Sequence, residues 1–293
     1  MTGDLDGCLV VDKPAGWTSH DVVARCRRLI GTRRIGHAGT LDPDATGVLL
    51  LGVGRGTRLL QYASALRKTY VGEIMLGIAT TTLDAAGDVT GRSDMSHVSL
   101  DDVRNTALTL TGRIDQVPPM MSAVKVGGRR LHELARQGIE VERAARPVEV
   151  FRFDVFPTGE AEVFRAFVEC SSGTYVRVLA ADLGTRLGGV AHLRRLRRLS
   201  VGSFTDSEAV ALDLVSRETL KPCLELVRDL PRVDASGELV AALSHGRVVE
   251  RAQLGVAGDG PWAVVGSDGE LAAVCVARGR DRARPAVVLH AAS

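Results

Sequence analysis

The residues from Gly36 to Gly47 combine a carboxylate and a histidine with a high density of residues that break regular structure. The segment reads G-H-A-G-T-L-D-P-D-A-T-G, with three glycines and one proline in twelve positions. Such a composition excludes a regular helix or a central strand and predicts an ordered loop. Pro43 biases Asp42 toward extended geometry. The carboxylate of Asp42 can therefore project from a fixed backbone, where it could serve as a nucleophile.

Asp42 also has a simpler interpretation as a turn residue. Aspartate before proline commonly accepts backbone N–H groups in an Asx turn, and an isolated Leu-Asp-Pro favours that role by about three to one. The choice between the two interpretations depends on the other motifs of the chain.

This loop resembles the catalytic loop of the TruB family of tRNA pseudouridine synthases, whose pattern is G-H-x-G-x-L-D-P-x-A-x-G. Five further segments resemble motifs of that family and follow in its order. They are Asp12-Lys13-Pro14-Ala15-Gly16 with Ser19, Lys68-Thr69-Tyr70, Leu76-Gly77 with Thr80, Thr82, Asp84 and Gly87, then Ser172 to Arg177, and His192 to Arg198. The resemblance extends from Leu9 to about Phe204. It favours the interpretation of Asp42 as a catalytic carboxylate over that of a turn residue.

The resemblance implies a role for each matching residue. Asp42 would be the catalytic aspartate, Tyr70 the ring that stacks on the target base, and Arg177 the partner of the catalytic carboxylate. An adjacent cation lowers the pKa of a carboxylate, so Arg177 is expected to keep Asp42 ionised. His37 would enter the RNA loop. The RNA-binding residues predicted in this way are His37, Lys13, Asp84, Leu196, Arg129, Arg130 and Arg194, with Arg136, Arg195, Arg197 and Arg198 as further candidate phosphate contacts.

The implied reaction sets its own requirements. Pseudouridine formation breaks the C1′–N1 bond of uridine, turns the freed uracil and joins C5 to C1′, so we expect no cofactor. The carboxylate of Asp42 could attack the ribose or the base, and the sequence leaves both open. A base inside a stacked loop must be extruded first, at a cost of a few kcal/mol. His37, five residues before Asp42, is suited to fill the vacancy.

Composition limits the class of protein and its partners. Net charge is only +2, but the stretch from Arg113 to Arg198 holds 15 basic and 10 acidic residues, which favours a nucleic-acid face. The five cysteines form no C-x-x-C pair, so we expect buried thiols and no metal site. The acidic N-terminus and the absence of a long apolar run predict a cytoplasmic protein without membrane contact. We expect a monomer that binds tRNA.

Periodicity predicts an α+β fold. Strand patterns cover residues 5–12, 48–53, 70–78, 148–156 and 162–170, the last two as a hairpin with one solvent-facing side. Helix patterns run from a cap at Ser19 to Ile30, from a cap at Ser99 toward Leu110, and from about Tyr175 to Leu187. The resemblance implies a pseudouridine synthase fold, a mixed and largely antiparallel central sheet flanked by helices and loops.

Two domains are expected. Residues 1–232 would form the catalytic domain, with a mobile basic insertion at about 125–147. Residues 233–293 resemble a small, β-barrel-like PUA domain, which implies binding to the acceptor end of tRNA, while the catalytic domain would bind the T-arm and isomerise uridine 55 of the T-loop.

Two other functions compete with this assignment. The run Gly52-Val53-Gly54-Arg55-Gly56-Thr57 suggests a cofactor loop of a methyltransferase or Rossmann domain, but it lacks the third glycine of G-x-G-x-x-G. A tRNA-folding chaperone without catalysis could use the same scaffold. The joint presence of Asp42, Tyr70 and Arg177 argues against that alternative.

Overall fold

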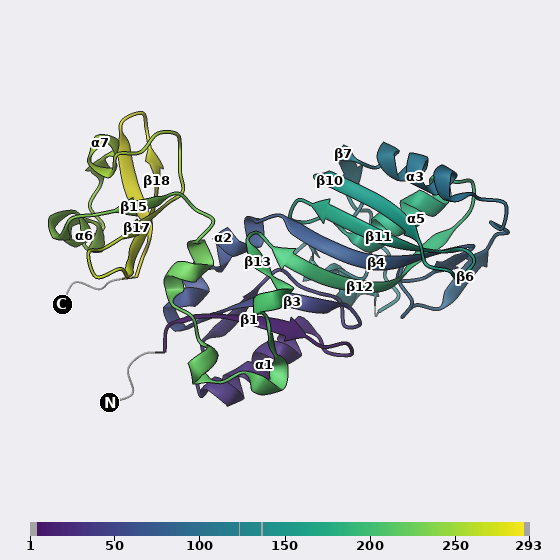
Figure 1. Cartoon of the computed structure of the whole chain (residues 1–293), viewed down its shortest axis with the longest axis horizontal. Helices are drawn as coiled ribbons and strands as arrows, with labels where there is room; N and C mark the ends of the chain where they lie inside the picture. The colour runs from purple at the N-terminus through teal and green to yellow at the C-terminus, as the bar shows by residue number, and fades with distance from the viewer. Residues whose placement is uncertain (1–4, 123, 136, 290–293) are drawn as a thin grey trace.

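A ten-stranded sheet forms the larger part of the molecule (Figure 1). The computed structural model describes residues 5–122, 124–135 and 137–289. In spatial order the strands are β14 (Val210–Ala211), β1 (Gly7–Lys13), β3 (Thr46–Val53), β12 (Ala191–Val201), β4 (Lys68–Leu76), β11 (Val163–Cys170), β10 (Arg146–Pro157) and β7 (Gly112–Gln116), while β2 (Ile35–Ala38) pairs with β3 and β13 (Phe204–Thr205) with β12.

The pairing of these strands is largely antiparallel. Only the β1–β14 and β3–β12 pairs run parallel, so the predicted mixed, largely antiparallel sheet is confirmed. The predicted hairpin is also present, since β10 and β11 pair antiparallel. In β4 each second side chain is buried, from Lys68 through Tyr70 to Leu76, because one face of the sheet packs on helices and the other does not.

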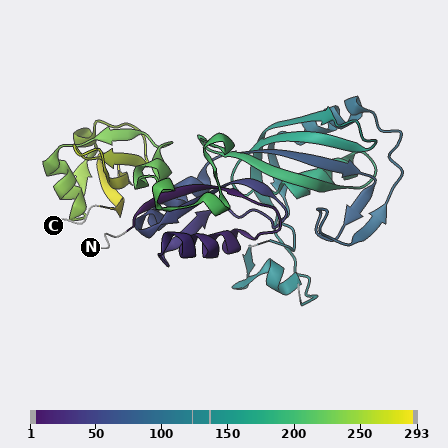
Figure 2. The same ribbon diagram turned by 60° about the horizontal axis from the view of Figure 1, so that its bottom comes forward.

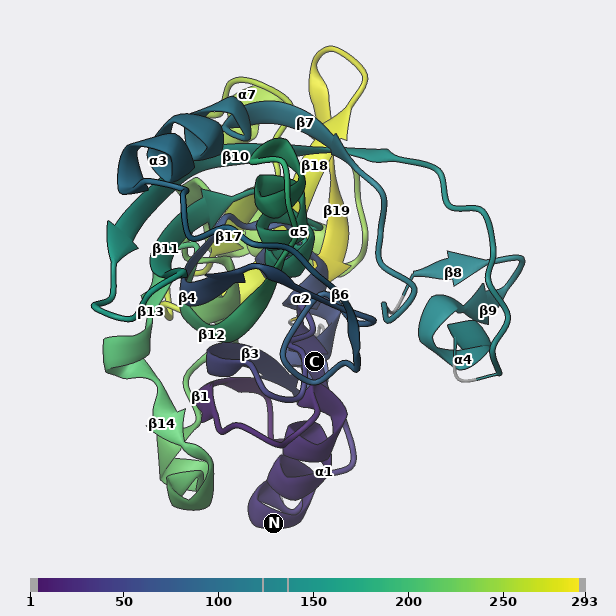
Figure 3. The same ribbon diagram turned by 90° about the vertical axis from the view of Figure 1, so that its right-hand side faces the viewer.

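Different helices pack on the two halves of the sheet. The helix α1 (Ser19–Ile30) packs on β1 and β3, whereas α3 (Leu100–Thr109) and α5 (Val176–Arg186) pack on β4, β10 and β11. Figure 3 shows α3 and α5 close together on that side. Ser99 caps α3 as predicted. The cap of α1 is Thr18 rather than Ser19, because Thr18 and Asp21 form a reciprocal capping box and the side chain of Ser19 bonds elsewhere.

A second, five-stranded sheet lies at one end of the molecule (Figure 1). Its order is β15 (Arg232–Asp234), β17 (Trp262–Val265), β18 (Leu271–Arg278), β19 (Arg282–Val288) and β16 (Val249–Glu250), with α6 (Gly237–Ser244) and α7 (Arg251–Leu254) beside it. Leu271, Val274 and Val287 share one hydrophobic cluster with Leu59 of the first unit. Packing therefore joins the two units, and the boundary at 232 stays a prediction.

The segment between β7 and β10 extends away from the main sheet. It contains β8 (Lys125–Val126), β9 (Arg129–Arg130) and α4 (Leu131–Ala135), which project to one side in Figures 2 and 3. Its position agrees with the predicted insertion, whose mobility stays a prediction. In the described part of the chain, no helix combines the length and apolarity required to cross a membrane.

Gly47, the second residue of β3, permits close contact between two parallel strands. Its φ is +100°, and a Cβ atom there would lie 2.2 Å from the carbonyl oxygen of Arg198 on β12. That distance is far below van der Waals contact, and the φ disfavours any side chain.

We expect Gly47→Ala to lower the free energy of unfolding by about 2 kcal/mol or more, because the β3–β12 pair must separate to admit the methyl group. Thermal denaturation would measure this. Gly91→Ala in the short strand β6 (Val89–Arg92) is the matched control, since its Cβ would meet only the Cβ of Ala79, at 4.0 Å. Equal destabilisation of the two variants would contradict the argument.

Candidate active site

Asp42 lies in the loop between β2 and β3. Its carbonyl oxygen accepts a hydrogen bond from the N–H of Ala45 at 3.1 Å, so the turn is made by the main chain, whereas an Asx turn would use the carboxylate. The carboxylate has a different partner, because Nη2 of Arg177 donates to Oδ1 of Asp42 at 3.0 Å. The loop therefore provides the turn while the side chain remains available for an ion pair.

Ser19 and Lys13 hold this loop through hydrogen bonds from their side chains to its backbone. The Ser19 hydroxyl accepts from the N–H of Leu41 at 2.9 Å and donates to its carbonyl at 3.3 Å. The ammonium of Lys13 donates to the carbonyls of Pro43 at 2.7 Å and Pro14 at 2.9 Å. Lys13 is 0% exposed, and burial lowers its pKa to about 8. The charge of Lys13 is thus used to hold the loop, and a contact of Lys13 with RNA stays a prediction.

Arg198, a predicted phosphate contact, is a second buried support of the loop. Its guanidinium donates to the carbonyl of Val48 at 2.7 Å and to that of Gly39 at 3.1 Å, and the residue is 1% exposed. The alternation of β12 places Leu196 and Arg198 on one face of the sheet. This alternation is the feature of the sequence that could have predicted the burial of Arg198.

Arg177 is the second residue of α5 and links four chain segments. Besides Asp42, it donates to the carbonyl of Met121 at 2.6 Å and to that of Thr82 at 3.4 Å, and it pairs with Oδ2 of Asp84 at 3.5 Å. A cation in the first turn of a helix is disfavoured by the helix dipole. Two carboxylates and two carbonyls offset that effect, so the guanidinium is held in one orientation.

The carboxylate of Asp84 forms part of this ion-pair cluster, and its contact with RNA stays a prediction. Oδ1 of Asp84 accepts from the hydroxyl of Thr82 at 2.5 Å and from the N–H of Ala86 at 3.1 Å, which leaves Oδ2 for Arg177. Leu83 adopts a left-handed φ of 64°, an unfavourable conformation for leucine that is typical of functional sites. The tight turn presents Asp84 to Arg177.

The pKa of Asp42 differs from the expectation. Burial raises it above the usual value of 3.8, and the Arg177 guanidinium lowers it by less. Arg177 thus acts in the predicted direction but does not outweigh desolvation. The native state binds the Asp42 proton more tightly than the unfolded chain does. Its contribution to the free energy of unfolding therefore falls as the pH rises from about 3.8 toward the native pKa.

Tyr70 and Leu196 lie on the same face of the sheet as Arg198. In the β4–β12 pairing Tyr70 is opposite Arg198, and Leu196 is opposite Gly72. Tyr70 is 8% exposed and packs in one cluster with Leu41 from the Asp42 loop. Burial raises the pKa of its phenol. The structure therefore brings Tyr70 and Leu196 to the side of the sheet that carries Asp42.

His37 occupies β2, opposite Leu51 of β3. The ring is half-buried, and its Nδ1 is buried without a hydrogen-bond partner in the described part of the chain. Burial, followed by the nearby Arg198, lowers the pKa of the imidazole. The ring is thus uncharged at neutral pH, and its entry into an RNA loop stays a prediction.

The arginines predicted to contact RNA lie in different parts of the structure. Arg194 pairs with Glu160 at 2.7 Å and with Glu73 at 3.9 Å. Glu73 alternates with Tyr70 along β4 and therefore points to the opposite face. Arg194 is therefore directed away from Asp42, and its contact with RNA stays a prediction. Arg129 is exposed on the insertion and donates to Gln137, whereas the side chain of Arg130 and residue Arg136 lie outside the described part.

Arg195 and Arg197 lie on the same face of the sheet as Arg194. Arg195 is opposite Glu73 in the β12–β4 pairing and approaches it at 3.8 Å. Arg197 forms a two-bond fork with Asp12, at 2.9 and 3.0 Å. These two arginines are therefore also directed away from Asp42.

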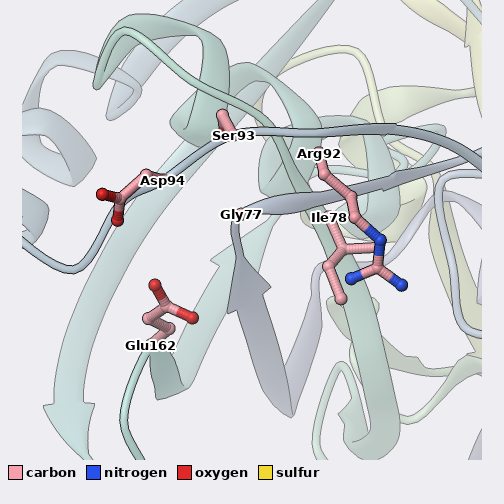
Figure 4. A pocket seen from close by; sticks show the side chains of 6 residues that line it. All are labelled: Gly77, Ile78, Arg92, Ser93, Asp94 and Glu162. Carbon is pink, nitrogen blue, oxygen red and sulfur yellow. The ribbon is translucent and has the colours of Figure 1, made fainter.

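A surface hollow of about 330 Å³ lies at the end of β4, away from these residues. Figure 4 shows the carboxylates of Asp94 and Glu162 on one side of Gly77 and Arg92 on the other. None of the predicted site residues lines this hollow. Within residues 5–122, 124–135 and 137–289, no three histidine, cysteine, aspartate or glutamate side chains are grouped to hold a metal ion. Four cysteines are buried and Cys223 is half-buried.

We expect Arg177→Gln to raise the pKa of Asp42 further, because it removes the largest interaction that opposes burial. Carboxyl carbon-13 chemical shifts recorded across pH would report this titration in both proteins. Arg194→Gln is the matched control, since Arg194 points to the other face, and it should leave the titration unchanged. A lower pKa in Arg177→Gln than in the wild type would contradict the analysis.

Comparison with known proteins identifies the family that the sequence motifs resemble. Residues 27–176 match the TruB family pseudouridylate synthase (N terminal domain), and residues 177–225 match the tRNA pseudouridylate synthase B C-terminal domain. The chain is 44% identical over 293 residues to tRNA pseudouridine synthase B of Mycobacterium sp. (strain KMS), covering 98% of this chain and 97% of the relative. The corresponding protein of Thermobifida fusca (strain YX) is 46% identical over 300 residues, covering 98% and 99%.

A solved structure shares the fold. The matching chain in a Cbf5-Nop10-Gar1 complex is 27% identical, with a TM-score of 0.74, and the match covers 97% of this chain and 84% of that one. The similarity thus includes the C-terminal sheet as well as the sheet that carries Asp42.

Proposed function

Because the chain belongs to the TruB family of pseudouridylate synthases, we propose that it is a tRNA pseudouridine synthase that isomerises uridine 55 of the T-loop with Asp42 as its nucleophile. One observation carries the proposal: Asp42 forms a 3.0 Å ion pair with Arg177 on a loop held by buried cations. The names of its relatives support tRNA as the substrate.

The site supplies a charged nucleophile in a partly desolvated position. Asp42 must be ionised to attack, and its side chain is 37% exposed, so a substrate atom can reach it. Burial favours the neutral acid, and Arg177 opposes that tendency. A carboxylate held in this balance is reactive because its negative charge is only partly compensated. The same geometry serves attack on the ribose or on the base.

The substrate base must leave its stack before it can reach Asp42. Extrusion costs a few kcal/mol, and a ring that fills the vacancy offsets part of that cost. We assign this filling role to His37, whose uncharged imidazole can stack in place of the base. Tyr70, on the face of the sheet that carries Asp42, supplies the ring against which the extruded uracil stacks.

Atoms balance without any added group. The C1′–N1 bond breaks, the C1′–C5 bond forms, and the proton lost from C5 is matched by one gained at N1. We therefore propose that the protein works without a cofactor. The insertion and the C-terminal sheet provide further surface for tRNA, which we assign to the T-arm and the acceptor end respectively. We expect a monomer to suffice because all the proposed catalytic residues come from one chain.

We expect Asp42→Asn to lower pseudouridine formation on an unmodified tRNA transcript by at least about a thousandfold, because the amide is not a nucleophile. Binding of tRNA should be retained. Release of tritium from C5-labelled uridine measures the reaction, and filter binding measures affinity.

Asp44→Asn is the matched control, since it removes an equal charge from an exposed position two residues away and should remain active. A variant Asp42→Asn that still isomerises uridine would exclude the proposed mechanism. A wild-type protein that binds and refolds tRNA without isomerisation would favour the chaperone alternative.

The affinity for tRNA should fall steeply with salt, because phosphate contacts dominate binding. We expect the dissociation constant to rise by at least about tenfold between roughly 50 and 200 mM salt. Arg129→Gln should reduce the slope of log Kd against log salt by about one if this exposed residue contacts a phosphate. Arg194→Gln, whose charge is already paired with Glu160, should not. A flat salt response would contradict the phosphate-contact model.

A further inference from the structure

Gln116, the last residue of β7, forms a two-bond contact with the start of α5. Its Oε1 accepts from the N–H of Tyr175 at 3.0 Å, and its Nε2 donates to the carbonyl of Tyr175 at 3.4 Å. Gln116 is 2% exposed, so water does not replace these bonds. Tyr175 occupies the N-cap position of α5, where its own side chain makes no capping bond. Gln116 therefore provides the side-chain contact at this cap.

Tyr175 determines where α5 begins. Its carbonyl accepts from the N–H groups of Val178 at 3.1 Å and Leu179 at 3.2 Å, which are the first bonds of the helix. Arg177 is the second residue of that helix. A shift or rotation of Tyr175 would therefore move the Cα of Arg177 and, at the end of its long side chain, the guanidinium by a larger amount.

The chain that follows Gln116 contacts the other end of Arg177. Five residues later, the carbonyl of Met121 accepts from Nη2 of Arg177 at 2.6 Å. The same Nη2 donates to Asp42 at 3.0 Å. One short segment thus holds both the helix start that carries Arg177 and the atom of Arg177 that contacts the carboxylate.

We propose that Gln116 is a positioning residue for the Arg177–Asp42 pair, which fixes the start of α5 so that the guanidinium stays within hydrogen-bond distance of the carboxylate. The inference rests on the proposed function, because the rate of uridine isomerisation is its readout. Gln116 contacts neither reacting atom and acts through Tyr175 and Arg177.

The chemistry of glutamine suits this role. The contact needs one acceptor and one donor at the same time, in a buried position beside a helix N-terminus. Methionine has a similar length but no amide oxygen for the N–H of Tyr175, and a buried donor left unpaired is costly. Glutamate keeps the acceptor for the N–H of Tyr175, the shorter of the two bonds, and loses the donor when ionised.

The test compares Gln116→Met with Gln116→Glu by single-turnover pseudouridine formation across pH, tRNA affinity and thermal denaturation. We expect Gln116→Met to slow the reaction by roughly ten- to a hundredfold and to change the tRNA dissociation constant by less than about twofold. Gln116→Glu should recover part of the rate. Gln61→Met is the matched control, since Gln61 is exposed and makes one bond to the backbone of Arg58.

The pH profile separates positioning from loss of structure. The charged groups that act on Asp42 are Arg177, Asp84, Lys13 and Asp44, and the variants change none of them directly. If Gln116 positions Arg177, the acidic limb of the rate profile should move to higher pH, in the direction expected for Arg177→Gln. A slower reaction with an unmoved limb would overturn the proposal.

A double-mutant cycle with Arg177→Lys gives the second criterion. We expect the combined variant to be little slower than the slower single variant, because both changes disturb the same contact. Fully additive effects would overturn the proposal. Gln116→Glu takes the place of Gln116→Met in the cycle if the methionine variant does not fold. Failure of the proposed function is distinguishable, because the wild-type protein would then form no pseudouridine.

Discussion

The ion pair between Arg177 and Asp42 joins residues 135 positions apart at 3.0 Å, and the arrangement of the site depends on it. Nη2 of Arg177 reaches the carboxylate only because α5 begins at Tyr175 and because the loop after β2 presents Asp42 toward that helix. The segment around Thr82 and the carbonyl of Met121 complete the partners of the guanidinium. Four segments distant in sequence must therefore fold correctly before the carboxylate has its partner.

Buried cations hold the surrounding backbone. Lys13 and Arg198 bond to carbonyls of the Asp42 loop and its flanks, and Lys68 bonds to the carbonyls of Ser64 and Leu66. Hydrogen bonds to charged groups contribute about 1.5–3 kcal/mol each, which offsets part of the desolvation of these cations. The charges of these cations thus hold the backbone around the site in place, while the carboxylate of Asp42 remains partly open to solvent.

Local pattern predicted the elements well and their roles less well. The alternation of β4, β10 and β11 and the capping box at Ser99 depend on neighbouring residues, and all appear as expected. Arg177 lowers the pKa of Asp42 as predicted, but burial raises it by more, because desolvation depends on everything packed around the carboxylate whereas the attraction of Arg177 follows from a motif.

The sequence by itself determined that Asp42 stands in an irregular loop, that Tyr70 lies in a strand, and that an arginine would meet the carboxylate. Only the tertiary structure decided which cations face the site. Arg194 and Arg198 are four residues apart on one strand, yet a β-bulge between Leu193 and Arg195 lets Arg194 pair with Glu73 on one face, whereas Arg198 is buried on the other. The alternation of a strand defines two faces, but long-range packing determines which of them carries Asp42.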